Sequence, residues 1–227
     1  STTRSEAAFE NQRTIVDGTL NILEAARRHA ARARIFITGS GVQFENTGGA
    51  ISEKTPFAAS SAYAAQRIAS VYLARYFRNQ HGLNIYIGYL FHHESPRRPD
   101  SHISQKIVQS VRHIEAGTKE VLAIGNLNVC KEWTFAGDVV RAIWLLVNQE
   151  RHCEVVIGSG EGHSIADWVQ VCFSELGISW RDYVREDKAF HSEYSYLVSD
   201  PRLLFSLGWK PLVGFSDLAR MMIQAAQ

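Results

Sequence analysis

Tyr63 and Arg67 lie four residues apart in a stretch of small residues that is predicted to open a helix. Positions with this spacing lie on one face of an α-helix, one turn from each other. A cation beside a phenol favours the phenolate, so the pair is a candidate for general-base chemistry. The spacing by itself is common and more typical of an amphipathic helix with a surface tyrosine and arginine. The surrounding sequence therefore has to decide between the two interpretations.

Two flanking segments give the pair a context. Upstream, the apolar run at residues 34–39 ends in Ser40, and downstream residues 90–98 read L-F-H-H-E-S-P-R-R. In this order the segments resemble the extended short-chain dehydrogenase/reductases that act on nucleotide sugars. The downstream phrase is similar to the L-F-N-H-E-S-P-R-R of the GDP-mannose 4,6-dehydratase family. The resemblance runs over essentially all 227 residues.

The resemblance implies catalytic roles for Ser40, Tyr63 and Arg67. In this family a tyrosine removes the proton of the sugar 4-hydroxyl while hydride leaves C4 for the nicotinamide, and a Ser/Thr hydroxyl bonds the developing carbonyl oxygen. The lysine that supports the tyrosine and binds the cofactor ribose is replaced here by Arg67, which keeps the charge but has a longer, planar group. We expect the guanidinium beside the Tyr63 ring, and the Ser40 and Tyr63 hydroxyls roughly 3–6 Å apart around one substrate oxygen.

One residue of the family pattern is missing. A 4,6-dehydratase carries an acid/base glutamate two residues after the hydroxyl, where this sequence has Val42, or Gly41 if the alignment shifts by one. The pattern therefore disfavours dehydration and leaves C4 epimerisation or reduction open. A non-catalytic relative that binds a nucleotide sugar or a protein partner is the alternative from another class.

The resemblance also implies binding positions. A nucleotide sugar carries about two negative charges, which gives cations at its site a clear purpose. Lys106 and Lys131 are, taken singly, more typical of solvated surface charges, and Arg97 with Arg98 can bind a cofactor phosphate or bridge subunits. A metal site is not predicted at 92–94, because adjacent residues of an extended segment face opposite ways. The cofactor, NAD or NADP, is expected at Tyr63, Arg67, Leu90, His92 and Arg97, and the substrate at His92, Glu94, Lys106, Lys131 and His191.

The order of apolar segments predicts an α/β fold. Residues 35–38 and 84–90 are continuous apolar runs, typical of parallel strands buried on both faces, and a helix from Tyr63 to about Asn79 connects them. Helical periodicity also covers residues 6–30. We expect residues 1–91 to form the later part of a Rossmann-type cofactor domain. Residues 92–227 are expected to form mainly a smaller C-terminal α/β substrate-binding lobe, with some segments returning to the sheet.

The second part of the chain shows shorter elements. Helices are predicted at residues 103–116, 138–149 and 216–225, and strands at 121–124, 129–133 and 154–157. Ser164 and Asp167 have the spacing of a capping box, which predicts a helix start. A glycine-rich G-x-x-G-x-x-G turn after a strand, which would hold a dinucleotide pyrophosphate, is absent from the sequence. We expect that turn in a segment preceding this chain.

Composition narrows the partners. The formal net charge of +1 argues against a nucleic-acid or membrane surface, and no apolar run reaches the roughly 18 residues that span a bilayer. Hydrophobic residues at 45% and charged residues at 21% are ordinary for a globular protein. Cys130, Cys153 and Cys172 lack any C-x-x-C spacing, which favours reduced thiols in a cytoplasmic protein. We expect a homo-oligomer, a dimer or a tetramer.

Overall fold

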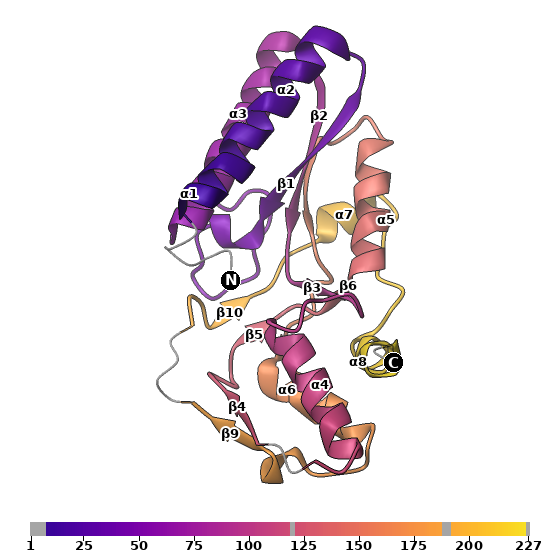
Figure 1. Cartoon of the computed structure of the whole chain (residues 1–227). Helices are drawn as coiled ribbons and strands as arrows, with labels where there is room; N and C mark the ends of the chain where they lie inside the picture. Colours follow the sequence, from indigo (N-terminus) through magenta and orange to yellow (C-terminus); the bar gives the residue numbers. More distant parts are fainter. Residues whose placement is uncertain (1–7, 119–120, 188–191, 226–227) are drawn as a thin grey trace.

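The core of the first part is a parallel three-stranded sheet. A computed structural model describes residues 8–118, 121–187 and 192–225. Strands β1 (Arg34–Ser40), β2 (Asn84–Leu90) and β7 (Glu154–Ile157) are hydrogen-bonded in the order β1-β2-β7, with both pairs parallel (Figure 1). The prediction that residues 35–38 and 84–90 are parallel strands of one sheet is confirmed. The segment at 154–157, from the second part of the chain, pairs with β2 in this sheet.

Helix α3 (Ala62–His81) connects β1 to β2 and carries Tyr63 and Arg67 in its first two turns. It begins at the N-cap Ser61, whose hydroxyl oxygen accepts a hydrogen bond from the Ala64 amide at 3.2 Å. It ends at Gly82, where φ of 64° suits glycine because this residue has no Cβ to clash. Both ends of the helix are therefore set by local sequence signals.

Helices cover both faces of the sheet (Figure 1). On one face α3 lies beside the segment formed by α1 (Ala8–Asn11), a π-helical stretch η2 (Gln12–Asp17) and α2 (Gly18–His29). Val71, Ala74 and Phe77 of α3 are buried there with Ile35 and Ile85. On the other face α5 (Ala136–Val147) packs over the sheet, and α7 (Arg202–Ser206) also contacts β7. The helix predicted at 138–149 thus starts and ends two residues earlier.

The second part forms a smaller α/β lobe. Helices α4 (Ile103–Glu115), α6 (Ile165–Ser174) and α8 (Phe215–Ala225) pack against one another. At their centre the indoles of Trp133 and Trp168 stack with ring centroids 4.5 Å apart. The capping box predicted at Ser164 and Asp167 is present at the start of α6.

The strands of this lobe are short. β3 (His93–Glu94) pairs with β6 (Thr134–Phe135), and β4 (Leu122–Ile124) pairs with β9 (Val184–Glu186). β5 (Cys130–Lys131) lies between β10 (Tyr196–Leu197) and β8 (His163–Ser164). The strand predicted at 129–133 is therefore only two residues long. Two 3₁₀ turns, η3 (Gly41–Gln43) and η4 (Trp180–Asp182), complete the described elements.

An ion-pair network ties α3 to the sheet. Glu154 of β7 accepts hydrogen bonds from Arg75 at 2.7 Å and from the Tyr89 hydroxyl at 2.6 Å, and it also pairs with Arg78. Burial would raise the pKa of Glu154, but the hydrogen bonds from these partners outweigh it and lower the pKa to about 2. The network holds the helix that carries Tyr63 and Arg67 against β2 and β7.

Within the described parts of the chain, we find no helix that combines the length and the apolarity needed to cross a bilayer.

Candidate active site

A cavity of about 560 Å³ opens at the carboxyl ends of β1 and β2. Parallel sheets bind ligands at this edge, because loops leaving adjacent strands leave a crevice between them. Ser40 at the end of β1, Leu90 at the end of β2, and Tyr63 and Arg67 of α3 line it. The fold therefore brings side chains of β1, α3 and β2 together in one cavity.

Arg67 is held between the phenol and the strand. Its Nε donates to the Tyr63 hydroxyl oxygen at 3.1 Å, and its guanidinium carbon lies 5.2 Å from the Tyr63 ring centroid. Its Nη1 donates to the carbonyl oxygen of Thr38 at 2.9 Å and to the Thr38 hydroxyl at 2.7 Å. The guanidinium lies beside the ring, as the spacing of four predicts, and Thr38 fixes its orientation.

Ser40 and Tyr63 line the same cavity. The Ser40 amide donates to the side-chain oxygen of Gln43 at 2.8 Å, which fixes the chain where β1 passes into η3. The 3–6 Å separation of the two hydroxyls stays a prediction. Val42, which with Gly41 is one of the two positions expected to match the family's glutamate, also lines the cavity and offers only an aliphatic surface there.

Lys131 brings a buried ammonium group to the cavity. The residue is 6% exposed, and its Nζ lies 4.6 Å from the Trp133 ring centroid. Burial lowers the pKa of Lys131 to about 8, while the nearby charge of Glu94 opposes that effect. A desolvated cation facing a cavity is suited to an anionic ligand.

His92 and Glu94 lie in different layers of the site. His92 lines the cavity, and burial together with the charge of Lys131 lowers its pKa to about 3, so that its imidazole is neutral at pH 7. Glu94 is 1% exposed and lies behind the cavity wall. Its carboxylate oxygens are 2.7 Å from His92 Nε2 and 3.3 Å from Arg98 Nε. Glu94 thus contacts two residues that face the cavity.

Two predicted binding positions are elsewhere. Arg97 and Lys106 are exposed and are not among the described residues that line the cavity. Arg98 and His102 line it instead. His191 lies outside the described residues.

Sequence reasoning also missed Thr38. Alternation along the strand was an available signal, because residues two apart in a strand face the same way and Thr38 is two before Ser40. Arg98 was considered with Arg97, but the sequence could not distinguish which of the two would face the cavity. His102 had no local signal.

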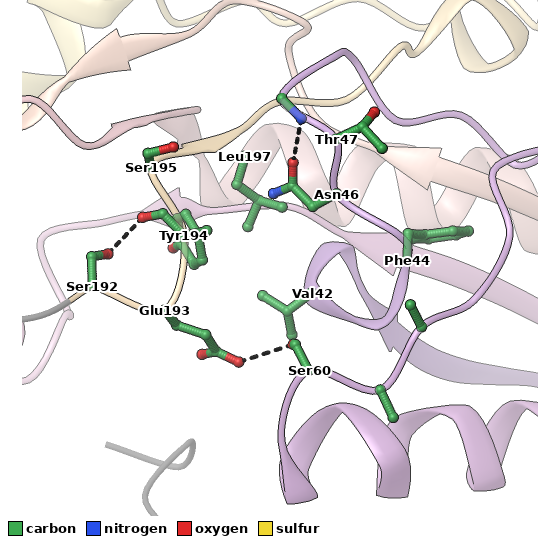
Figure 2. A pocket seen from close by; sticks show the side chains of 13 residues that line it. Val42, Phe44, Asn46, Thr47, Ser60, Ser192, Glu193, Tyr194, Ser195 and Leu197 are labelled. Carbon is green, nitrogen blue, oxygen red and sulfur yellow. Dashed lines mark hydrogen bonds between the residues drawn. The ribbon is translucent and has the colours of Figure 1, made fainter.

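A second cavity of about 660 Å³ adjoins the first. Figure 2 shows the side chains that line this second cavity. The two cavities share a wall, formed by Val42, residues 192–194 and Leu197. Across the second cavity the Ser60 hydroxyl donates to a Glu193 carboxylate oxygen at 3.2 Å. Burial, together with the charge of Glu193, raises the pKa of Tyr194 to about 12.

Fold and site together define an α/β protein with a Rossmann-type parallel sheet and a tyrosine–arginine pair in a cavity at its carboxyl edge. The chain belongs to the GDP-mannose 4,6 dehydratase family, whose sequence profile matches residues 3–222.

Named relatives agree with this assignment. GDP-mannose 4,6 dehydratase 2 of Arabidopsis thaliana is 37% identical over 216 residues, covering 92% of this chain and 58% of that protein. GDP-mannose 4,6 dehydratase of Homo sapiens is 32% identical over 193 residues, covering 76% of this chain and 52% of that protein. The chain thus spans little more than half the length of these relatives.

Solved structures share the fold at lower identity. RMD from Pseudomonas aeruginosa, solved with NADPH, superposes with a TM-score of 0.88 at 19% identity, covering 100% of this chain and 78% of that one. The dTDP-glucose 4,6-dehydratase from Bacillus anthracis, solved with NAD, has a TM-score of 0.82 at 17% identity and covers 94% of this chain and 68% of that one. These similarities support the Rossmann-type architecture.

Proposed function

We propose that the chain is part of an NAD(P)-dependent nucleotide-sugar enzyme of the epimerase/dehydratase type, which works by transient oxidation of C4 of a hexose. The observation that carries the proposal is the hydrogen bond from Arg67 to the Tyr63 phenol oxygen, in a cavity that Ser40 also lines. Family membership supports the class of reaction.

The three residues have separate roles in this proposal. Tyr63 takes the proton from the 4-hydroxyl as a general base, and Arg67 orients the phenol oxygen through the hydrogen bond from Nε. Ser40 donates a hydrogen bond to the oxygen that becomes a carbonyl. NAD or NADP, when bound, supplies the acceptor for the hydride that leaves C4. Thr38 keeps Arg67 in place through the two hydrogen bonds from Nη1.

The cavity suits the end of such a cofactor. It offers a guanidinium, a phenol and the apolar side chain of Leu90, which together can hold hydroxyls and a flat ring. We propose Tyr63, Arg67, Leu90 and His92 as the residues that contact it. Arg97, exposed outside the cavity, stays a proposed contact for a cofactor phosphate. In this scheme residues 1–91 belong to the cofactor domain and 92–227 mainly to the substrate lobe.

The substrate is proposed to lie with its pyrophosphate near Lys131. The buried ammonium provides the charge, and the neutral His92 imidazole provides a hydrogen-bonding group beside it. Glu94 contributes indirectly, through its contacts with His92 and Arg98. Lys106, exposed outside the cavity, stays a proposed contact, and so does His191, which lies outside the described residues.

The residues favour C4 epimerisation or reduction over dehydration. Val42 presents no acid or base where the family pattern has a glutamate, so the side chain at that position has no means to remove the C5 proton. The same substitution is the observation that favours the alternative, a non-catalytic relative that binds a nucleotide sugar.

Self-association and location complete the proposal. On α3, Tyr72 and Tyr76 are 56% and 55% exposed and lie one turn apart, and Ile22 of the neighbouring α2 is 57% exposed. Such an apolar strip on a helix pair supports a homo-oligomer, a dimer or a tetramer.

The free thiols of Cys130, Cys153 and Cys172 support a reducing compartment such as the cytoplasm.

The test uses the full-length protein with NAD+ or NADP+ and a panel of nucleotide sugars, with turnover and binding measured separately. Tyr63→Phe is expected to lower kcat by about 10²–10⁴ while the Kd of the nucleotide sugar stays constant, because only the proton acceptor is lost. Arg67→Lys reports whether the site has adapted to arginine: loss of activity indicates adaptation, and a gain indicates a damaged ancestral site. Nucleotide-sugar binding without turnover in all forms would identify a non-catalytic relative.

A further inference from the structure

The two adjoining cavities differ in charge. The first is lined by the cationic side chains of Arg67, Arg98 and Lys131. Among the described residues that line the second, Glu193 is the only one with a charged side chain, and the others are small, polar or apolar. The first cavity is therefore suited to an anion, whereas the second cavity disfavours one.

Glu193 lies on the boundary between the two cavities and lines both of them. Figure 2 shows its side chain reaching toward Ser60, the partner to which it is hydrogen-bonded. Ser60 immediately precedes Ser61, the N-cap of the helix whose first turn carries Tyr63. The carboxylate is thus placed near the N-terminal end of α3, close to the turn that carries Tyr63.

The volumes of the two adjoining cavities are consistent with one extended ligand that occupies both. Each cavity by itself has the volume of an ordinary small-molecule site, which runs from about 300 to 1,000 Å³. If the reacting C4 lies at Ser40 and Tyr63 and the pyrophosphate near Lys131, the remaining part of the sugar meets the shared wall. Val42 and Leu197 give that wall an apolar surface, and Glu193 gives it an acceptor for hydroxyl groups.

We propose that the second cavity is a further compartment of the substrate site, and that Glu193 selects sugars with an uncharged, hydroxyl-bearing substituent there over sugars with a carboxylate. This inference rests on the proposed function. An ionised carboxylate accepts hydrogen bonds from hydroxyls and repels a second carboxylate at short range. Glu193 is therefore a specificity-determining residue for the group at C6 of the hexose.

The test measures binding to the full-length protein by calorimetry at pH 7.5, in two matched series. One series is GDP, GDP-mannose and GDP-mannuronate; the other is UDP, UDP-glucose and UDP-glucuronate. Within a series the two sugars differ only in a hydroxymethyl or a carboxylate at C6. We expect the wild type to bind the neutral sugar about tenfold more tightly than the uronate, as repulsion between two carboxylates in a partly aqueous cavity implies.

Glu193→Gln keeps the size of the side chain and one acceptor oxygen but removes its charge. It is expected to reduce the preference to about twofold or less, without changing the affinity for the nucleoside diphosphate. Glu45→Gln is the matched control, because Glu45 is exposed on the neighbouring loop but does not line either cavity. The control is expected to keep the full preference.

The outcomes separate the two proposals. Equal binding of both sugars by the wild type, or a preference that Glu193→Gln leaves unchanged, overturns the role of Glu193 while the nucleotide-sugar site stands. An equal loss of preference in Glu45→Gln also overturns it, since a general effect of surface charge would then be responsible. Failure of both nucleoside diphosphates and all four sugars to bind overturns the proposed function and this inference with it.

Discussion

Replacing Glu154 by glutamine tests whether the ion-pair network under α3 stabilises the part of the fold that positions the site. The carboxylate accepts hydrogen bonds from Arg75 and Tyr89 and pairs with Arg78, and its side chain is 16% exposed. Glutamine has nearly the same shape, but it is uncharged and replaces one acceptor oxygen by a donor. The variant therefore leaves two arginines next to a neutral group.

The size of the effect follows from the pKa of Glu154, which is lowered from 4.5 to about 2. One pKa unit corresponds to about 1.4 kcal/mol, so the depression corresponds to about 3 kcal/mol. Solvent screening at a partly accessible side chain lowers this figure to about 2–3 kcal/mol. The folded-state pKa lies below the unfolded value, so this stability is present above about pH 4.5 and is lost as the pH falls through about 2.

The assay is urea unfolding of the purified protein, followed by circular dichroism at pH 7. We expect Glu154→Gln to lower the free energy of unfolding by about 2–3 kcal/mol with an unchanged denaturant slope. Repeating the measurement between pH 5 and pH 3 should show a smaller difference in unfolding free energy between wild type and variant, because Glu154 takes up a proton in the unfolded chain over this range while it stays ionised in the folded protein.

Glu24→Gln provides the control. Glu24 forms ion pairs with Arg27 and Arg28 on the exposed side of α2, and pairs of this kind contribute little. The urea midpoint of the Glu24→Gln variant is expected to match that of the wild type. The expectation is wrong if Glu154→Gln lowers the free energy of unfolding no more than Glu24→Gln does. It is also wrong if the difference in unfolding free energy between wild type and Glu154→Gln does not depend on pH.

Three further results are expected. Nucleotide-sugar affinity should fall as the pH rises through about 8, because Lys131 then loses its proton. The Lys131→Met variant should bind the nucleotide sugar weakly at every pH. A wild-type Kd that stays constant from pH 7 to 9 would contradict this role of Lys131. Thr38→Val should lower kcat by about tenfold, because the hydrogen bond between the Arg67 guanidinium and the Thr38 hydroxyl is lost, whereas Thr38→Ser should keep the wild-type kcat. Equal kcat values for the two variants would show that this hydrogen bond is unimportant for catalysis. Ser164→Ala removes the N-cap of α6 and should cost about 1 kcal/mol of stability in urea unfolding, and a variant as stable as wild type would argue against the cap.

Several local elements of the fold around the site were predictable from the amino-acid sequence. The strand at 84–90 and the strand at 154–157 have the bounds that their apolar runs predicted. Helix α3 starts one residue before the predicted Tyr63 and ends two residues after the predicted Asn79, at His81, which precedes the cap residue Gly82. The contact between Arg67 and Tyr63 was also predictable, since a spacing of four on a helix brings side chains together wherever the helix lies. These features depend on neighbours within about one or two turns.

Tertiary structure alone decided which distant residues meet. Thr38 reaches Arg67 across 29 positions, and Ser60 reaches Glu193 across 133. The burial of Lys131 could not be read from a strand of two residues, because such a strand is too short to show a period. The sequence does not show whether a lysine side chain is solvated or packed against an indole. Only the folded chain supplies the environment of low polarity that lowers the pKa of Lys131.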